Sequence, residues 1–380
     1  MKTAYLDPRS GDTFPIGELR WAGPDMSPLL LTPMEGIHPG DIDTATRSLW
    51  RYRAALPFEP DSPITLGEGC TPLIRNTLHG APAHLKCEEL MPTGSFKDRG
   101  VSVMLSLLRA QGIAEILEDS SGNGGASVAA YAAAAGMHAT IMVPASTSPA
   151  KTVQMRAYGA AIELVEGDRQ FVADAALRRA EQIFYASHSW HPFFLHGVKT
   201  VAYELWEDLG FRAPDNVIVP CGAGSNVLGC EIGFSELFRA GEIETIPRIF
   251  AAQPANCAPV AGSFLAGSAD IPVELTVAPT IAEGTAIARP IRLPEILGAL
   301  RETYGGAVML SENEIGQAVL DLARIGIYVE PTAAQPSAAF AKLLESGAVT
   351  PDQTTVLVLT GTGLKATSRI AELLSVKLSA

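Results

Sequence analysis

The sequence predicts an α/β protein with two open, mostly parallel sheets flanked by helices. Short apolar runs rich in β-branched residues alternate with Ala/Leu-rich stretches of helical length, and glycine-rich segments directly follow several of the apolar runs. The chain has 380 residues, of which 47% are hydrophobic, so it buries more apolar surface than one compact core holds. We therefore expect two closely packed domains.

The first fifty residues are rich in Pro, Gly and Asp and have no strong periodicity apart from Leu29–Leu31. They predict an irregular N-terminal extension. Residues 1–37 contain no cysteine, and no metal site is expected there. The composition changes after Ser62–Pro63, where the regular alternation of strands and helices begins.

From that point the expected elements follow one another at short intervals. Strands are predicted at Glu115–Glu118, Ala139–Pro144, Ala161–Val165, Val217–Val219, Arg248–Ala252, Val308–Leu310 and Thr355–Thr360. Helices are predicted at Gly100–Ala110, Gly124–Gly136, Lys151–Tyr158, Asp168–Tyr185, His196–Leu209, Ser311–Arg324 and Pro336–Glu345. Repeated strand–helix–strand units predict parallel strands with helices on both faces, and such sheets bind ligands at the carboxyl ends of their strands.

Charge and cysteine content exclude several classes of function. The formal net charge of -13 and the absence of a Lys/Arg run argue against nucleic acid or an anionic membrane as a partner. The five cysteines are widely spaced without a CxxC pair, which disfavours a disulfide framework and a zinc site. No apolar stretch reaches the length of a bilayer span without interruption. We expect a cytoplasmic protein without a bound metal.

The first segment whose residues could take part in catalysis is Pro92–Gly100, with the sequence Pro-Thr-Gly-Ser-Phe-Lys-Asp-Arg-Gly. Lys97 falls at the start of a predicted helix, where the helix dipole opposes its charged form and favours a nucleophilic amine. Formation of an imine with an aldehyde needs such an amine. A solvated lysine in a surface turn is the alternative for this segment taken alone.

The second segment, Ser120–Ser127, lies between a predicted strand and an Ala-rich helix. Its glycines let backbone amides approach an anion, Asn123 offers a neutral donor, and Ser121 offers a hydroxyl. The pattern fits a carboxylate. An ordinary glycine-rich helix cap is the alternative.

Two further glycine loops follow predicted strands. Pro220–Gly229 has the strand, glycine turn and helix start that hold a phosphate with main-chain N–H groups. It lacks a complete G-x-G-x-x-G, so a phosphate monoester fits better than a dinucleotide. Leu359–Lys365 places Thr360 at a strand end, where a hydroxyl can hydrogen-bond a neutral pyridine nitrogen. A turn without a ligand is the alternative for this second loop.

In their order, these motifs resemble the fold-type II family of pyridoxal phosphate enzymes, whose fold is that of the tryptophan synthase β subunit. Within that family the similarity is greatest to the threonine synthases. It runs from Ser48–Tyr52 through Leu66–Leu73 and Pro92–Gly100 to the Thr-Gly-Thr-Gly-Leu-Lys segment that starts at Thr360. The ordered set of motifs is far more specific than any one of them.

The resemblance implies a role for each motif. Lys97 would form the imine with pyridoxal 5'-phosphate and serve as the base for the substrate α-proton, Asn123 would contact the phenolic oxygen, and Thr360 the pyridine nitrogen. The phosphate cradle would consist of Gly222, Ala223, Gly224, Ser225 and Asn226. The substrate carboxylate would lie near Ser121, Gly122 and Gly124. Candidates for a substrate phosphate are Thr93, Ser148, Lys151 and Arg156.

The resemblance also implies a domain organisation and an assembly. Residues 1–60 would pack on a large cofactor-binding domain formed by 61–102 and 188–380, and 103–187 would form a smaller mobile domain. The protein would be a homodimer. The substrate would be an amino acid, which a threonine synthase takes as O-phosphohomoserine.

Two departures leave the reaction open. His196 stands where relatives commonly carry an acidic residue, and is expected to be a satisfied core histidine or a residue that alters specificity. The segment around Glu283 is similar to threonine and serine dehydratases. Elimination or replacement at the β-carbon of serine, threonine or phosphoserine is therefore the second enzymatic interpretation. A non-catalytic protein that keeps the cofactor as a sensor is a third.

Overall fold

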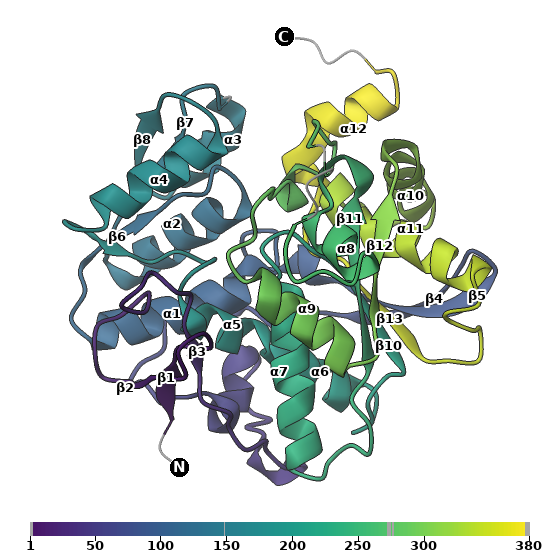
Figure 1. Cartoon of the computed structure of the whole chain (residues 1–380), viewed down its shortest axis with the longest axis horizontal. Coiled ribbons are helices and arrows are strands. Elements are labelled where there is room, and N and C mark those ends of the chain that lie inside the picture. Colours follow the sequence, from purple (N-terminus) through teal and green to yellow (C-terminus); the bar gives the residue numbers. More distant parts are fainter. Residues whose placement is uncertain (1–2, 148, 272–274, 276, 377–380) are drawn as a thin grey trace. The chain divides into compact units, whose positions relative to one another are not determined.

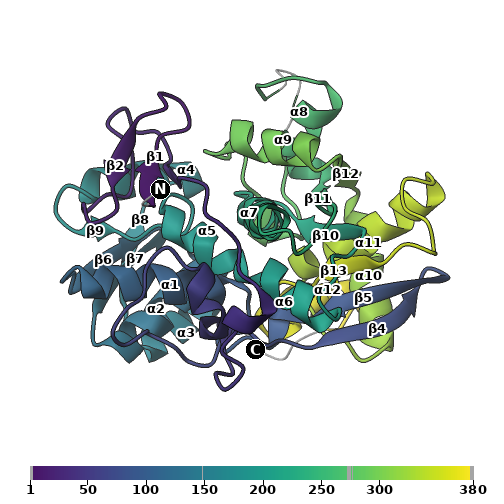
Figure 2. The same cartoon turned by 90° about the horizontal axis from the view of Figure 1, so that it is seen from below.

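The computed structural model describes residues 3–147, 149–271, 275 and 277–376. The chain divides into two compact units, one formed by Met1–Cys70 and Lys97–Thr200, the other by Thr71–Phe96 and Val201–Ala380. The two units are drawn in Figures 1 and 2 and are described below one at a time. Their boundaries differ from the domains expected from the sequence, and that domain assignment stays a prediction.

The first unit is built on a four-stranded parallel sheet of order β8-β7-β6-β9. Its strands are β6 (Glu115–Glu118), β7 (His138–Pro144), β8 (Ala161–Val165) and β9 (Phe184–Tyr185). Its helices are α1 (Lys97–Ala110), α2 (Asn123–Ala135), α3 (Pro149–Ala157), α4 (Arg169–Arg179) and α5 (Pro192–Val198). Successive strand residues point to opposite faces. Leu117 therefore packs with α4, and Ile141 lies against Gly125 of α2 on the other face.

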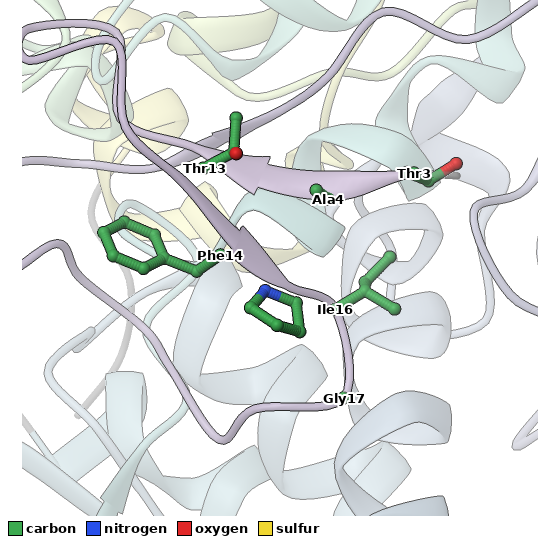
Figure 3. A pocket seen from close by; sticks show the side chains of 7 residues that line it. Thr3, Ala4, Thr13, Phe14, Ile16 and Gly17 are labelled. Atoms are coloured by element: carbon green, nitrogen blue, oxygen red, sulfur yellow. The ribbon is translucent and has the colours of Figure 1, made fainter. Parts of the chain in front are cut away.

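The N-terminal residues belong to the first unit. They form a small antiparallel sheet of β1 (Ala4–Leu6), β2 (Thr13–Pro15) and β3 (Leu30–Leu31), followed by the 3₁₀ helices η1 (Pro39–Asp41) and η2 (Leu49–Ala55). Figure 3 shows a hollow beside β1 and β2 that is lined by residues 3–4 and 13–17. None of these residues has an acidic or basic side chain. The residues that line the hollow therefore offer no acidic or basic side chain for proton transfer.

The second unit is built on a six-stranded sheet of order β12-β11-β10-β13-β5-β4. Its strands are β4 (Leu73–Leu78), β5 (Ala81–Lys86), β10 (Asn216–Pro220), β11 (Arg248–Pro254), β12 (Gly306–Leu310) and β13 (Thr355–Val358). All neighbouring strands are parallel except the hairpin pair β4 and β5. This sheet and that of the first unit confirm the prediction of two open, mostly parallel sheets.

Helices cover both faces of the second sheet (Figure 2). One face carries α7 (Ser225–Arg239), α8 (Pro259–Leu265) and α9 (Leu293–Glu302), and the other carries α10 (Glu312–Arg324) and α11 (Pro331–Glu345). The core under α10 and α11 joins Ile218 and Leu357 of the sheet to aliphatic residues of both helices. The unit also contains α6 (Thr200–Asp208), α12 (Thr367–Leu373), η3 (Glu88–Leu90), η4 (Ala255–Cys257), η5 (Glu283–Thr285) and η6 (Gly363–Ala366).

Three of the predicted helices are wrong in extent. The predicted helix Pro336–Glu345 begins earlier, at Pro331, and Pro336 lies inside it. The predicted helix Asp168–Tyr185 ends at Arg179, and β9 follows it with only two residues, too few to show an alternating pattern. The predicted helix His196–Leu209 is divided between two helices, since α5 ends at Val198 and α6 begins at Thr200. The first of these helices begins at Pro192, because proline is tolerated in the first turn of a helix.

Candidate active site

Lys97 is the first residue of α1, and main-chain bonds of the second unit fix the residues that precede it. Ser95 pairs with Gly361 in an isolated antiparallel bridge, and the N–H of Phe96 donates to the carbonyl oxygen of Thr360 over 3.0 Å. These contacts attach the segment that leads into Lys97 to the end of β13. The sequence predicted both segments as parts of one site.

The Lys97 side chain is half-buried and lies beside an aromatic ring of the first unit. Its Nζ atom is 5.5 Å from the ring centroid of Phe194 on α5. This ring packs on the first turn of α1 because Gly100 has no side chain there. A Cβ atom at Gly100 would lie 2.3 Å from Phe194 Cδ2. Gly100 and Phe194 therefore define one wall of the space around the lysine.

The loop Ser120–Gly124, which contains the predicted carboxylate site, belongs to the first unit, as Lys97 does. Asn123 is the first residue of α2 and half-buried, and a Cβ atom at Gly125 would lie 2.0 Å from the carbonyl oxygen of Ser120. Ser127 in the next turn donates to Asp98 Oδ1 over 2.6 Å. This bond ties the start of α2 to the start of α1. The N-terminal N–H groups of a 13-residue helix can bind an anion.

A buried carboxyl–imidazole pair lies next to these groups. His188 Nδ1 is 3.0 Å from Glu118 Oε1, and the main-chain N–H of His188 donates to Glu118 Oε2 over 3.1 Å. Burial raises the pKa of Glu118 to about 7 and holds the pKa of His188 well below its ordinary value; the positive charge of Lys97 acts on both groups. Burial also raises the pKa of the neighbouring Asp119 to about 6.

The predicted phosphate cradle is a loop between a strand and a helix, and its role stays a prediction. It follows β10 and leads into α7, a helix of 15 residues whose N-cap, Gly224, has a φ of 85°. A Cβ atom at Gly224 would lie 2.2 Å from Ile296 Cδ1. Burial raises the pKa of the Cys221 thiol to about 12, so this side chain stays neutral. The loop therefore offers main-chain N–H groups and the side chains of Ser225 and Asn226 to an anion.

Thr360 provides a direct test of whether the cofactor fits. Its side chain is 2% exposed, and its Oγ1 atom has no hydrogen-bond partner among the described residues. A buried hydroxyl without a partner is unfavourable, so this atom fits a ligand acceptor such as a pyridine nitrogen. Ser95 Oγ, two residues before Lys97, is also buried without a described partner.

The phosphate cradle and Thr360 lie at the same edge of the second sheet. β10 and β13 are parallel neighbours in which Ile218 pairs with Leu357, so Pro220 and Thr360 both come at the carboxyl ends of their strands. Gly222 lies close to η5, where its Cβ atom would be 3.1 Å from the carbonyl oxygen of Gly284. The second unit thus brings together the predicted partners of a phosphate and of a pyridine nitrogen.

The predicted substrate residues fall in different places. Ser121 is half-buried in the glycine loop, whereas Gly122 is exposed and Gly124 is buried. Thr93 is buried in the turn before Lys97, in the second unit. Lys151 and Arg156 are exposed on α3, and the remaining phosphate candidate, Ser148, lies outside the described residues.

The two departures from the family pattern are also located. His196 is buried in α5, and its Nδ1 atom has no partner among the described residues, so the expectation of a satisfied core histidine is wrong in that respect. Glu283 begins η5, and its Oε1 atom is 3.0 Å from Nη2 of Arg369 in an exposed ion pair.

Sequence reasoning missed Glu118, His188 and Phe194. Glu118 is the last residue of a predicted strand, and the adjacent acids Glu118 and Asp119 at that strand end were a usable signal. His188 lies 70 positions further along the chain, and no spacing rule connects the two.

In the described part of the chain, no group of three or more His, Cys, Asp or Glu residues is arranged to hold a metal.

Two parallel sheets, a lysine at the first turn of α1 and a glycine cradle at the start of α7 define the class of fold-type II pyridoxal phosphate enzymes. The family described as "Pyridoxal-phosphate dependent enzyme" matches residues 64–361. The chain belongs to this family.

Curated relatives narrow the similarity further. The chain is 35% identical over 326 residues to a threonine synthase from Methanocaldococcus jannaschii, covering 83% of this chain and 80% of the relative. It is 32% identical over 334 residues to a threonine synthase from Methanosarcina acetivorans, covering 85% and 82%. Among solved structures, the threonine deaminase of a T.th. strain has a TM-score of 0.64 and 28% identity, over 77% of this chain and 92% of that one.

Proposed function

We propose that the protein is a pyridoxal phosphate-dependent lyase of the threonine synthase type. It would convert O-phosphohomoserine and water to threonine and phosphate by γ-elimination followed by addition of water at the β-carbon. The observation that carries this proposal is the similarity to threonine synthases at 35% identity over most of both chains. The bound cofactor supplies a conjugated ring that accepts electrons from the substrate α-carbon.

The residues of this chain would divide the work between binding and proton transfer. Lys97 holds the cofactor aldehyde and moves the α-proton. The hydroxyl of Thr360, which has no described partner, donates to the ring nitrogen, and Asn123 contacts the phenolic oxygen. The phosphate cradle is formed by Gly222, Ala223, Gly224, Ser225 and Asn226.

The substrate carboxylate would lie on the loop of Ser121, Gly122 and Gly124, at the N-terminus of α2. A substrate phosphate would use Thr93, Lys151 and Arg156, of which only Thr93 is buried.

A second candidate reaction is the dehydration of threonine or serine. It is supported by the likeness to a threonine deaminase and by the ionisable pair of Glu118 and His188 beside Lys97, because a hydroxyl leaving group needs a proton. Both reactions would use the same lysine and the same cofactor contacts.

Steady-state assays separate the two reactions. The purified protein with excess cofactor is given O-phosphohomoserine or L-threonine, and phosphate, threonine and 2-oxobutyrate are measured. The proposal expects threonine and phosphate in equal amounts from the first substrate. Release of phosphate without threonine would contradict it, and 2-oxobutyrate from threonine alone would establish the second reaction.

The remaining expectations concern the state of the protein in the cell. We propose a cytoplasmic homodimer, in line with the general preference of enzymes for two-fold assemblies. No helix in the described part of the chain is long and apolar enough to cross a membrane. Sedimentation of the holoenzyme at several concentrations tests the dimer, and a monomer at all of them would contradict it.

A further inference from the structure

The pair of Glu118 and His188 has no role so far in the proposed threonine synthase reaction, although it was given as support for dehydration. His188 is 6% exposed and Glu118 is completely buried, and two hydrogen bonds join them. Because Oε1 of Glu118 is bonded to Nδ1, the second ring nitrogen of His188, Nε2, is the one directed away from the carboxyl group. The arrangement fixes the ring in one orientation.

The pair lies against both parts of the site in the first unit. The His188 ring is 5.7 Å from the ring of Phe194, and the Lys97 Nζ atom is 5.5 Å from that same ring. On the other side, a Cβ atom at Gly124 would lie 2.8 Å from His188 Nδ1. One imidazole thus adjoins the lysine neighbourhood and the loop proposed to hold the substrate carboxylate.

The protonation of the pair suits transfer near neutral pH. Burial raises the pKa of Glu118 to about 7 and lowers that of His188, so below about pH 7 the pair holds one proton on the carboxyl side. In that form, Nε2 of His188 carries a hydrogen. Above about pH 7, Nδ1 of His188 donates to the Glu118 carboxylate and Nε2 is an acceptor. The charged groups that act on the pair are Lys97, Asp119 and Arg169.

We propose that His188 is a catalytic residue that exchanges a proton with the oxygen atom at the substrate β-carbon, and that Glu118 is the positioning residue that orients it. The inference rests on the proposed function, in which water adds at this carbon. It assigns the α-proton to Lys97 and the oxygen-bound proton to His188.

The proton balance is complete in both directions. When water adds, an electron pair of its oxygen forms the C–O bond, and the electron pair of the carbon–carbon double bond moves to the α-carbon, which takes a proton from Lys97. The proton lost from water passes to Nε2 while Glu118 keeps the proton on Nδ1. In dehydration, the C–O electron pair leaves with the oxygen, Nε2 gives its proton to form water, and Glu118 returns a proton to Nδ1. No further reactant is required.

This assignment predicts a split between two steps of one reaction. A phosphate leaving group departs as an anion without a proton, so γ-elimination does not need His188. The addition of water does need it, because a base must remove a proton from the attacking oxygen. A variant without the imidazole should therefore still release phosphate but fail to make threonine.

The experiment compares His188→Gln and Glu118→Gln with His138→Gln, in which an exposed histidine of the same unit is replaced. Each cofactor-loaded protein is given O-phosphohomoserine, and the ratio of threonine to phosphate is measured, together with exchange of the α-proton for deuterium in heavy water. That exchange depends on Lys97 and shows that a variant is folded and loaded.

For His188→Gln we expect the ratio to fall by about 100-fold or more, with α-proton exchange near the wild-type rate. Glu118→Gln should lower the ratio less and remove its pH dependence near neutrality, and His138→Gln should match the wild type. A wild-type ratio in His188→Gln would overturn the inference while the proposed function stands. A wild-type protein that makes no threonine would overturn both.

Discussion

The main-chain N–H of Phe96 donates to the carbonyl oxygen of Thr360 over 3.0 Å. This bond attaches the residue before the proposed imine lysine to the residue whose hydroxyl has no described partner. Because the contact is made by backbone atoms of the second unit, it does not depend on a flexible side chain. It also survives replacement of either side chain, which makes the hydroxyl testable by itself.

Thr360→Val should change the apoprotein and the holoenzyme in opposite directions. Valine keeps the shape of the side chain and removes a buried hydroxyl that has no described partner, so the apoprotein should be unchanged or more stable by about 1 kcal/mol. Loss of the bond to the ring nitrogen should weaken cofactor binding by about 1 kcal/mol. Thermal unfolding of the apoprotein and a cofactor titration measure the two effects.

Thr355→Val is the matched control, at the start of β13. The Thr355 hydroxyl is buried like that of Thr360 but accepts a hydrogen bond from Asn216 Nδ2 over 3.0 Å. Its loss leaves the Asn216 amide short of a partner and should destabilise the apoprotein by about 1 to 3 kcal/mol. Equal stability changes in both variants would contradict the lack of a hydrogen-bond partner for the Thr360 hydroxyl in the apoprotein.

Gly224→Ala should disrupt the phosphate cradle. Gly224 has a φ of 85°, which is unfavourable for alanine by about 1 to 2 kcal/mol, and the new methyl group would meet Ile296. Gly241→Ala is the control, because Gly241 has a φ of 76° and a Cβ atom added there would meet nothing within 4 Å. We expect the first variant to unfold at lower denaturant and to bind the cofactor more weakly; identical behaviour of the two would contradict a packed cradle.

The pair of Glu118 and His188 should give an unusual pH dependence of stability. Between pH 4.5 and 6.5, the ordinary pKa values of the two groups, the unfolded chain holds one proton on His188 and the native pair holds one on Glu118. The proton counts are equal, so the pair contributes no slope there. Above 6.5 the unfolded chain loses its proton first, and stability falls until Glu118 ionises at about 7.

Replacing either partner should restore a slope of known sign. His188→Gln leaves a buried carboxyl whose stability contribution is lost as pH rises from about 4.5 to about 7. Glu118→Gln leaves a buried neutral imidazole whose contribution is lost as pH falls below about 6.5. Urea unfolding across this range measures both. Parallel curves for the wild type and both variants would show that the two groups are not paired.

Much of the fold and of the cofactor site was predictable because its signals are local. Glu115–Glu118 and Ala161–Val165 were predicted with the bounds that the structure has, since each is a short apolar run between turns. The segment of Lys97 and the loop of Gly224 are each recognisable within ten residues. The loop of Gly224 also follows the predicted strand Val217–Val219, which was sufficient to place it at a strand end.

The rest depends on contacts between distant residues. Nothing near His188 in the sequence indicates that its partner is Glu118, because parallel strands bring together residues from separate β–α units. The hairpin of β4 and β5 was not predicted for another reason. Pro82 lies within β5, and a proline argues against a strand except at a sheet edge or at the first position of a strand. Burial, which sets the pKa values of Glu118 and Asp119, is likewise a property of the folded chain.

The central claim is that Lys97 holds pyridoxal phosphate as an imine. The most direct test is reduction of the cofactor-loaded protein with borohydride, followed by proteolysis and mass spectrometry of the lysine-containing peptides. We expect one pyridoxyl adduct, on Lys97, and none there in Lys97→Ala. An adduct on another lysine, or a wild-type protein without any adduct in excess cofactor, would contradict it.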